Sequence, residues 1–296
     1  MSVLRTPDAR FLNLPGYDFD SHYVEIDSLR MHYLDEGAAD GPVVLLLHGE
    51  PSWSYLYRKM VAPIADAGCR VIAPDLIGFG KSDKPTAQGD YSYAGHVDWM
   101  RQFIETLDLK DISLFCQDWG SLIGLHVAAE NQRRFARIAV GNGDLPTGDR
   151  EFPRAFRIWR AFARWSPWFP IGRIIQAGTI TELSKAEIAA YDAPFPSARY
   201  KAGARAFPML VPTEADNVAS DDNRRAWVSL EQFQKPFLTT FSNRDPITRG
   251  GERNFHERVP GARNQPHVKI RNAGHFLQED KPVELADMLI RFFKTP

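Results

Sequence analysis

Residues 112–120, Ile-Ser-Leu-Phe-Cys-Gln-Asp-Trp-Gly, decide the fold. The run begins with five mostly apolar residues, which is typical of a strand buried on both faces of a parallel sheet. A helical pattern at 119–132 follows directly, so Asp118 lies in a sharp strand-to-helix turn. The small residues Cys116 and Gly120 on either side let such a turn close. This is the setting of a nucleophile elbow, which presents one side chain at the edge of a sheet. By itself, the aspartate could equally be a helix N-cap.

Short apolar runs of the same kind alternate with helical patterns along the chain. The predicted strands are 43–47, 69–74, 137–140, 236–241 and 267–270, and residues 22–35 predict a hairpin that turns at 27–28. Helical spacing of apolar residues predicts helices at 91–107 and from Lys281-Pro282 onward. This alternation predicts an α/β fold, with a parallel or mixed sheet covered by helices on both faces.

One stretch, residues 145–215, contains no clear strand and is rich in Trp, Phe, Pro and Arg. Helices are expected near 153–165, 171–178 and 184–191. We interpret 145–215 as a helical cap inserted into a core made of residues 1–144 and 216–296. The polar cluster from Glu214 to Asn223 is interpreted as a loop that rejoins the core.

The composition excludes several classes of protein. Of 296 residues, 44% are hydrophobic and 25% are charged, which is ordinary for a globular chain and excludes a disordered one. The net charge is −1, so no overall field draws the chain to nucleic acid or anionic lipid, and neither partner is expected. A monomer and a dimer are equally compatible with this charge.

Location and redox chemistry follow from a few further features. The two cysteines, Cys69 and Cys116, cannot form a disulfide framework and are read as buried thiols. The N-terminus lacks the pattern of a secretory signal, and the longest aliphatic run, 43–47, is far below the roughly 18 residues of a membrane span. We therefore expect a cytoplasmic protein.

Two further residues complete a catalytic arrangement with Asp118. His275 lies after the last predicted strand and before the last helix, and Asp245 directly follows the strand 236–241. The chain order of nucleophile, acid and histidine is the one found with elbow nucleophiles. Asp144, after the strand 137–140, is the rival for the acid, and we prefer Asp245. No metal-ligand spacing is present, and Gly80-Lys81-Ser82 lacks the earlier glycine of a phosphate loop, so no metal or cofactor is expected.

An aspartate nucleophile defines the reaction type. Its carboxylate attacks a carbon that bears a leaving group and forms an ester, which water then hydrolyses with a His–Asp pair as the base. The loop His48-Gly49-Glu50-Pro51 follows a predicted strand, and its Glu50 N–H is expected to form an oxyanion hole with the N–H of Trp119. The Glu50 side chain is either a general acid or a buried structural carboxyl.

Two electrophiles fit this chemistry, an alkyl halide and an epoxide. A halide leaving group needs weak N–H donors in a dry pocket, and an indole is such a donor. Trp119 follows the nucleophile directly, and the cap offers Trp159, Trp165 and Trp168 as a second donor. An epoxide oxygen needs O–H donors, for which the cap tyrosines Tyr191 and Tyr200 are candidates. A non-catalytic protein that binds a small ligand is a third, weaker reading, because it would not need all three catalytic residues.

Together these motifs resemble haloalkane dehalogenases of the α/β-hydrolase fold, and the resemblance runs over essentially the whole chain. The matching stretches are His48 to Arg58, Gly78 to Pro85, Gln117 to Gly120, Ala193 to Pro196 and Gly203 to Pro208. The resemblance implies a mostly parallel eight-stranded sheet flanked by helices, with an inserted helical cap. It implies conversion of a haloalkane and water to a primary alcohol, a halide ion and a proton, with no cofactor.

The resemblance also assigns roles to residues. Asp118 would be the nucleophile, His275 the base and Asp245 the acid that orients it, as in the first subfamily; the second subfamily places a Glu where this chain reads Gly141-Asn142-Gly143-Asp144. The halide would lie between Trp119 and Trp159, since Ala155 to Trp159 matches an Ala-Phe-x-x-Trp stretch of one branch. Another branch carries the second tryptophan where this chain has Thr179. The substrate pocket would be lined by Leu122, Phe207, Pro208, Val211 and Ile247.

Overall fold

The computed structural model describes residues 1–295 and contains one large, strongly twisted sheet of eight strands in the order β10-β9-β8-β7-β4-β5-β3-β2. Only β3 runs against the other strands, since it pairs antiparallel with both of its neighbours, β2 and β5. The strands are β2 (His22–Ile26), β3 (Leu29–Gly37), β4 (Val43–Leu47), β5 (Arg70–Pro74), β7 (Ile112–Asp118), β8 (Phe135–Gly143), β9 (Phe237–Ser242) and β10 (Val268–Ile270). The predicted α/β fold with a mostly parallel eight-stranded sheet is confirmed.

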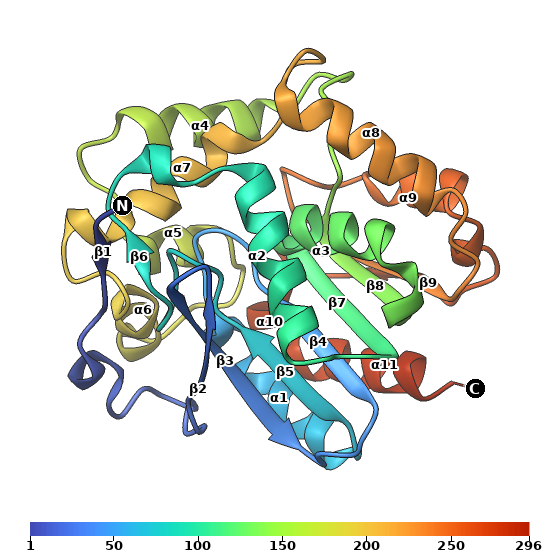
Figure 1. Cartoon of the computed structure of the whole chain (residues 1–296), viewed down its shortest axis with the longest axis horizontal. Helices are drawn as coiled ribbons and strands as arrows, with labels where there is room; N and C mark the ends of the chain where they lie inside the picture. Colours follow the sequence, from blue (N-terminus) through green and yellow to red (C-terminus); the bar gives the residue numbers. More distant parts are fainter. Residues whose placement is uncertain (296) are drawn as a thin grey trace.

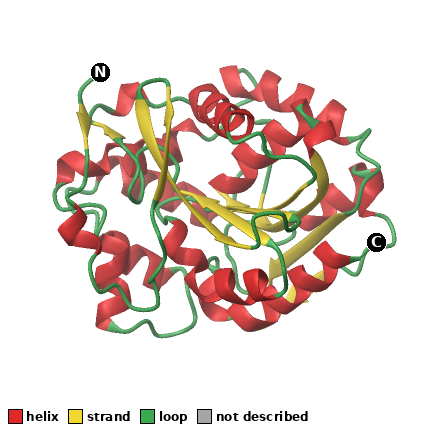
Figure 2. Ribbon diagram, turned by 60° about the horizontal axis from the view of Figure 1, so that its bottom comes forward, coloured by secondary structure: helices red, strands yellow, loops and turns green. Residues whose placement is uncertain are grey.

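Eleven α-helices accompany this sheet within residues 1–295, and Figure 2 shows the strands between two layers of them. They are α1 (Arg58–Asp66), α2 (Tyr93–Thr106), α3 (Trp119–Glu130), α4 (Arg154–Trp165), α5 (Ile171–Ala177), α6 (Lys185–Asp192), α7 (Ala202–Leu210), α8 (Val218–Leu230), α9 (Glu252–Arg258), α10 (Leu277–Asp280) and α11 (Pro282–Lys294). Helices α1 and α11 pack on each other, and α3 packs against both α2 and α8 (Figure 1). The central strands are therefore covered on both faces, which explains their continuous apolar sequences.

A second, two-stranded sheet lies near the N-terminus. β1 (Val3–Leu4) pairs antiparallel with β6 (Lys84–Pro85), so the first residues are tied to the loop that follows β5 (Figure 1). The side chain of Arg5 strengthens this link, since its Nε donates to Asp83 over 2.7 Å.

Helices α4 to α7 follow β8 in the sequence and include the three helices predicted between 153 and 191. No strand occurs between β8 and β9, as the sequence predicted for 145–215. Figure 1 shows α4, α5, α6 and α7 gathered in one part of the molecule, beyond one end of the central strands.

The interpretation of the cluster between Glu214 and Asn223 as a loop was wrong in its second half, because α8 begins at Val218. The Asn217 side chain caps this helix by accepting the N–H of Ala219. Acidic residues are favourable in the first turn of a helix, so the polar residues that suggested a loop form a helix N-terminus. Most of the apolar residues that α8 buries, namely Ala226, Trp227 and Leu230, come after this turn.

Candidate active site

Asp118 occupies a strained turn between β7 and α3. Its φ of 52° and ψ of −128° lie outside the regions that L-residues with a side chain readily adopt. Two glycines make room for the turn: a Cβ at Gly120 would lie 2.2 Å from the Leu47 carbonyl oxygen, and one at Gly49 would lie 2.3 Å from Asp118 Oδ1. The turn holds the Asp118 side chain at the C-terminal ends of the parallel strands, where it lines a cavity.

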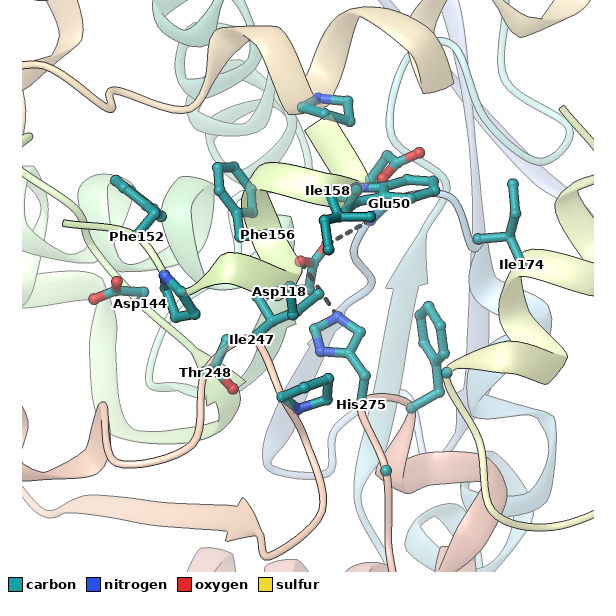
Figure 3. A pocket seen from close by; sticks show the side chains of 18 of the residues that line it. Glu50, Asp118, Asp144, Phe152, Phe156, Ile158, Ile174, Ile247, Thr248 and His275 are labelled. Carbon is teal, nitrogen blue, oxygen red and sulfur yellow. Dashed lines mark hydrogen bonds and ion pairs between the residues drawn. The ribbon is translucent and has the colours of Figure 1, made fainter. Parts of the chain in front are cut away.

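The three residues proposed for catalysis come together in space although they are up to 157 positions apart. His275 Nε2 lies 3.4 Å from Asp118 Oδ2, and His275 Nδ1 lies 3.1 Å from Asp245 Oδ2. Figure 3 shows the imidazole of His275 directed toward Asp118. Asp245 is fully buried and His275 is 6% exposed, so water screens neither contact appreciably.

Asp245 is fixed by the loop that follows β9. Its Oδ1 accepts the N–H of Ile247 over 2.9 Å, and its Oδ2 accepts the N–H and the hydroxyl of Thr248. The rival carboxylate, Asp144, faces away from His275: it pairs with Arg150 and accepts the N–H of Leu145. Asp245 is thus the carboxylate bonded to the imidazole.

The charges around His275 shift its pKa and that of its partner. Burial favours the neutral imidazole, but Asp245 and Asp118 together outweigh it and raise the pKa of His275 to about 10. Burial also opposes the charge of Asp245, yet His275 and the hydrogen bonds from Thr248 and Ile247 lower the pKa of this carboxyl. In the unreacted site His275 is therefore an imidazolium held between two carboxylates.

Two amide side chains around His275 were not assigned a role from the sequence. The Gln117 Nε2 lies 3.1 Å from His275 Nε2 and donates to the His275 carbonyl oxygen. Asn142 donates from its Nδ2 to the carbonyl oxygens of Gly274 and His275, both over 2.9 Å, and accepts the N–H of Ser242. These amides lock the His275 loop to β7, β8 and β9. Their positions at the ends of adjacent parallel strands were the only signal available in the sequence.

The predicted oxyanion hole is partly formed in this structure. The N–H of Glu50 donates to Asp118 Oδ1 over 2.7 Å (Figure 3). The N–H of Trp119 opens α3, where a helix leaves its first amides without a helical partner, and no bond from it to the Asp118 carboxylate is found among residues 1–295. The Asp118 oxygen held by Glu50 is Oδ1, which leaves Oδ2 as the oxygen nearer His275.

The Glu50 side chain itself is buried beside the nucleophile, with 4% exposure. Burial, followed by the negative charge of Asp118, raises the pKa of the Glu50 carboxyl well above its ordinary value. Its Oε1 has no hydrogen-bond partner within the described part of the chain. Both effects favour the neutral form of this carboxyl, which fits a buried structural group beside the nucleophile.

A cavity of about 1170 Å³ opens in front of Asp118 and is lined mainly by apolar side chains. Trp119 and Trp159 both line it, as do Thr179 and the partly exposed Trp168. The indole of Trp119 is 3% exposed and packs on Phe207 with ring centroids 4.3 Å apart. Trp159 stacks on Phe169 at 5.6 Å. Trp165 does not line the cavity.

Four of the five predicted pocket residues line this cavity, namely Leu122, Pro208, Val211 and Ile247. The prediction for Phe207 was wrong, because this residue is fully buried behind Trp119 and packs on Phe79 and His96. From the sequence alone, an apolar residue that lines the cavity cannot be distinguished from one that packs behind the lining.

The cap tyrosines do not face the cavity. The Tyr191 hydroxyl donates to the buried carboxylate of Glu279, and its ring packs edge-on against Tyr55. Neither Tyr191 nor Tyr200 lines the cavity around Asp118. Within residues 1–295, no group of three or more His, Cys, Asp or Glu residues is placed to hold a metal ion. None of the helices in this range is long and apolar enough to cross a membrane.

Comparison with known proteins extends this description. A family model described as the α/β hydrolase fold matches residues 42–282. A protein of Psychrobacter cryohalolentis named haloalkane dehalogenase is 54% identical over 297 residues, which covers 99% of this chain and 98% of that protein. A haloalkane dehalogenase of Mycobacterium marinum is 55% identical over 295 residues, with 98% and 99% covered. The tetrameric structure of haloalkane dehalogenase DpaA from Paraglaciecola agarilytica superposes with a TM-score of 0.94 at 37% identity, with both chains fully covered.

Proposed function

Because this chain belongs to the haloalkane dehalogenases of the α/β hydrolase fold, we propose that Asp118, His275 and Asp245 carry out its hydrolysis of carbon–halogen bonds. The observation that carries the proposal is the contact of one imidazole with both carboxylates, 3.4 Å from Asp118 and 3.1 Å from Asp245, at the floor of an apolar cavity. The substrates of the reaction are a haloalkane and water.

The first step is a displacement at carbon. Asp118 Oδ2 attacks the carbon that carries the halogen, because Oδ1 is held by the Glu50 N–H. The new C–O bond forms as the C–X bond breaks, and the bonding electron pair leaves with the halide. The indole N–H groups of Trp119 and Trp159, which line the same cavity, donate to the departing halide. The product of this step is an ester of Asp118.

Ester formation changes His275 from a cation to a base. The ester carries no charge, so the carboxylate 3.4 Å from Nε2 no longer holds the imidazolium proton, and the pKa of His275 falls. The proton leaves to solvent. The neutral Nε2 then removes a proton from a water molecule, which attacks the Asp118 carbonyl carbon. Asp245 retains its bond to Nδ1 and stabilises the imidazolium that forms.

Hydrolysis passes through a tetrahedral oxyanion on Oδ1, which already accepts the N–H of Glu50. The N–H of Trp119 is the proposed second donor, since it lies at the first residue of α3, where a helix provides no acceptor for its amides. Collapse of the intermediate returns the Asp118 carboxylate and releases the alcohol. Over the cycle one haloalkane and one water give one alcohol, one halide and one proton.

The finer assignments also remain proposals. Asp245 after β9, together with Trp159 in α4, supports membership of the first subfamily. Residues 145–215 are proposed as the cap that closes the cavity, because α4 and α5 contribute much of its lining. A cytoplasmic location and a monomeric or dimeric state stay predictions, and one solved relative is a tetramer. The epoxide alternative is not favoured, since the hydroxyl of Tyr191 is bonded to Glu279.

The test uses the ester itself. We expect wild type to release halide from 1,2-dibromoethane and 1-bromobutane with a fall in pH. His275→Phe should form the ester without hydrolysing it, so the intact protein should gain the mass of the alkyl group. The control is the double variant His275→Phe/Asp118→Asn, which should gain no mass. A mass gain that survives in the double variant, or the absence of both halide release and a mass gain, would overturn the assignment of Asp118.

A further inference from the structure

The outer face of α4 and the loop after it expose large apolar side chains. Ile158 is 58% exposed, Trp165 is 74% exposed and Trp168 is 61% exposed. A tryptophan is normally among the more buried residues of a protein, and two so exposed within four positions are unusual. Several large apolar side chains exposed in one part of a surface indicate an interaction site.

Positive charge is concentrated in the same part of the chain. Residues 150–178 contain six arginines and one acidic residue, Glu151, with no lysine or aspartate. The segment therefore carries +5, whereas the whole chain carries −1, so the remaining residues carry −6. The net charge of the whole chain, from which no membrane partner was expected, does not reveal this local excess of positive charge.

The exposed apolar and cationic residues lie on one side of α4. At about 100° per residue, Arg154, Arg157, Ile158, Arg164 and Trp165 fall within one arc of the helix, opposite the buried Phe156 and Ala163. We call these five residues, together with Trp168 and Arg173, the cap face. Helix α4 thus buries an apolar side against the core and exposes a side that carries apolar and cationic residues.

The arginines of the cap face have no acidic partners in the part of the chain that the structure describes. No ion pair among residues 1–295 includes Arg154, Arg157, Arg164 or Arg173. Two of them lie instead beside the exposed indoles: the Arg164 guanidinium is 4.8 Å from the ring centre of Trp165, and that of Arg173 is 5.8 Å from Trp168. Their charge is therefore available to an anionic partner.

From this surface we infer that the cap face docks onto an anionic lipid bilayer, with its tryptophans at the level of the headgroups. Basic helices with exposed aromatic residues bind membrane surfaces by this combination of charge and apolar burial. Tryptophan prefers the membrane–water interface. A second copy of this chain fits the face poorly, because a twofold contact would set four unpaired arginines against four others.

Docking would also bring the cavity to the bilayer. Ile158, Trp168 and Arg173 belong to the cap face and also line the cavity in front of Asp118. Apolar haloalkanes dissolve in the lipid, so a docked enzyme would take up its substrate where that substrate is most concentrated. This consequence rests on the proposed function. Binding to lipid itself does not depend on that function.

Binding is measured by cosedimentation with phosphatidylcholine vesicles that contain or lack phosphatidylglycerol. We expect wild type to bind only the anionic vesicles and to be released by high salt. Arg157→Glu/Arg164→Glu removes two cationic groups outside the cavity and should weaken binding by about 30-fold or more. Trp165→Ala should weaken binding by about tenfold. Halide release from 1,2-dibromoethane without vesicles should be unchanged in both variants, which shows that they are folded.

The matched control is Arg263→Glu/Arg271→Glu, which makes the same charge change at two exposed arginines away from the cap. It should bind anionic vesicles within about twofold of wild type after correction for net charge. The inference is overturned if wild type binds neither vesicle, if the control loses as much affinity as the cap-face variant, or if the cap-face substitutions abolish self-association in solution but leave vesicle binding intact. Because the assay uses no substrate, its failure is distinct from a failure of the proposed catalytic roles.

Discussion

Replacing Asp118 by Asn should lower the pKa of His275, which is the property that makes hydrolysis of the ester possible. His275 lies between two carboxylates, and its pKa is raised to about 10. Asparagine keeps the shape of the side chain but removes its charge, as ester formation does. An opposite charge within 4–6 Å changes a pKa by about 1–3 units, so we expect the pKa of His275 to fall by about 1–3 units. Each unit corresponds to about 1.4 kcal/mol of interaction with the imidazolium.

The assay is an NMR titration of the imidazole protons in wild type and in Asp118→Asn. The His275 signal is assigned by its absence in His275→Phe. Asp144→Asn is the matched control, because Asp144 pairs with Arg150 and does not contact His275. An unchanged His275 pKa in Asp118→Asn, or an equal fall in Asp144→Asn, would refute the view that the nucleophile's charge sets the protonation state of the base.

The raised pKa of His275 also predicts how stability depends on pH. The folded protein binds the His275 proton more tightly than the unfolded chain, whose histidine has a pKa near its ordinary value of 6.5. This contribution to the free energy of unfolding is fully present below pH 6.5 and is lost as the pH rises toward about 10. In Asp118→Asn the loss should occur at a lower pH, which thermal unfolding at a series of pH values would show.

Three further predictions concern the site and the core. Trp119→Phe and Trp159→Phe should each weaken bromide binding by about tenfold or more, since a hydrogen bond to a charged group is worth about 1.5–3 kcal/mol; fluorescence quenching by bromide measures this, and Trp165→Phe should leave it unchanged. Glu50→Gln should mimic the neutral carboxyl that burial and Asp118 favour, so it should retain activity at high pH where wild type declines; an equal decline in both proteins would count against a titrating Glu50. Arg58→Ala should destabilise the fold by about 3–5 kcal/mol in urea unfolding, because it deprives the buried Glu279 of its main partner, whereas Arg263→Ala should have little effect.

The parts of the site that could be predicted from the sequence are those set by local order along the chain. The elbow at Asp118 needs only a buried strand, small neighbours and a following helix, and all three lie within a few residues. Loops at the carboxyl ends of parallel strands meet at one edge of the sheet, which is why His275 and Asp245 could be placed near Asp118 without any structure. The family resemblance then indicated which tryptophan of the cap faces the same cavity.

The remaining features depend on contacts that no local pattern encodes. The Gln117 amide reaches His275 across 158 positions, and Asn142 bonds to the carbonyl oxygen of Gly274 across 132. Phe207 and Leu122 are both apolar, and only packing decides that one supports Trp119 and the other lines the cavity. The basic side of α4 was also invisible in the total charge, because an excess of acidic residues elsewhere balances it.

The surroundings of the three carboxyls in the site, rather than their residue types, determine which charge state each one favours. Asp245 receives hydrogen bonds from the imidazole, two backbone N–H groups and a hydroxyl, and these hold it ionised despite full burial. Glu50 is almost as deeply buried, but its Oε1 has no donor among residues 1–295, so burial raises the pKa of this carboxyl and favours its neutral form. The displacement step creates an anion in the cavity that Glu50 also lines. A charged Glu50 would repel both this halide and the Asp118 carboxylate, so a neutral Glu50 is the condition under which its backbone N–H can stabilise negative charge on Asp118 while its side chain adds none.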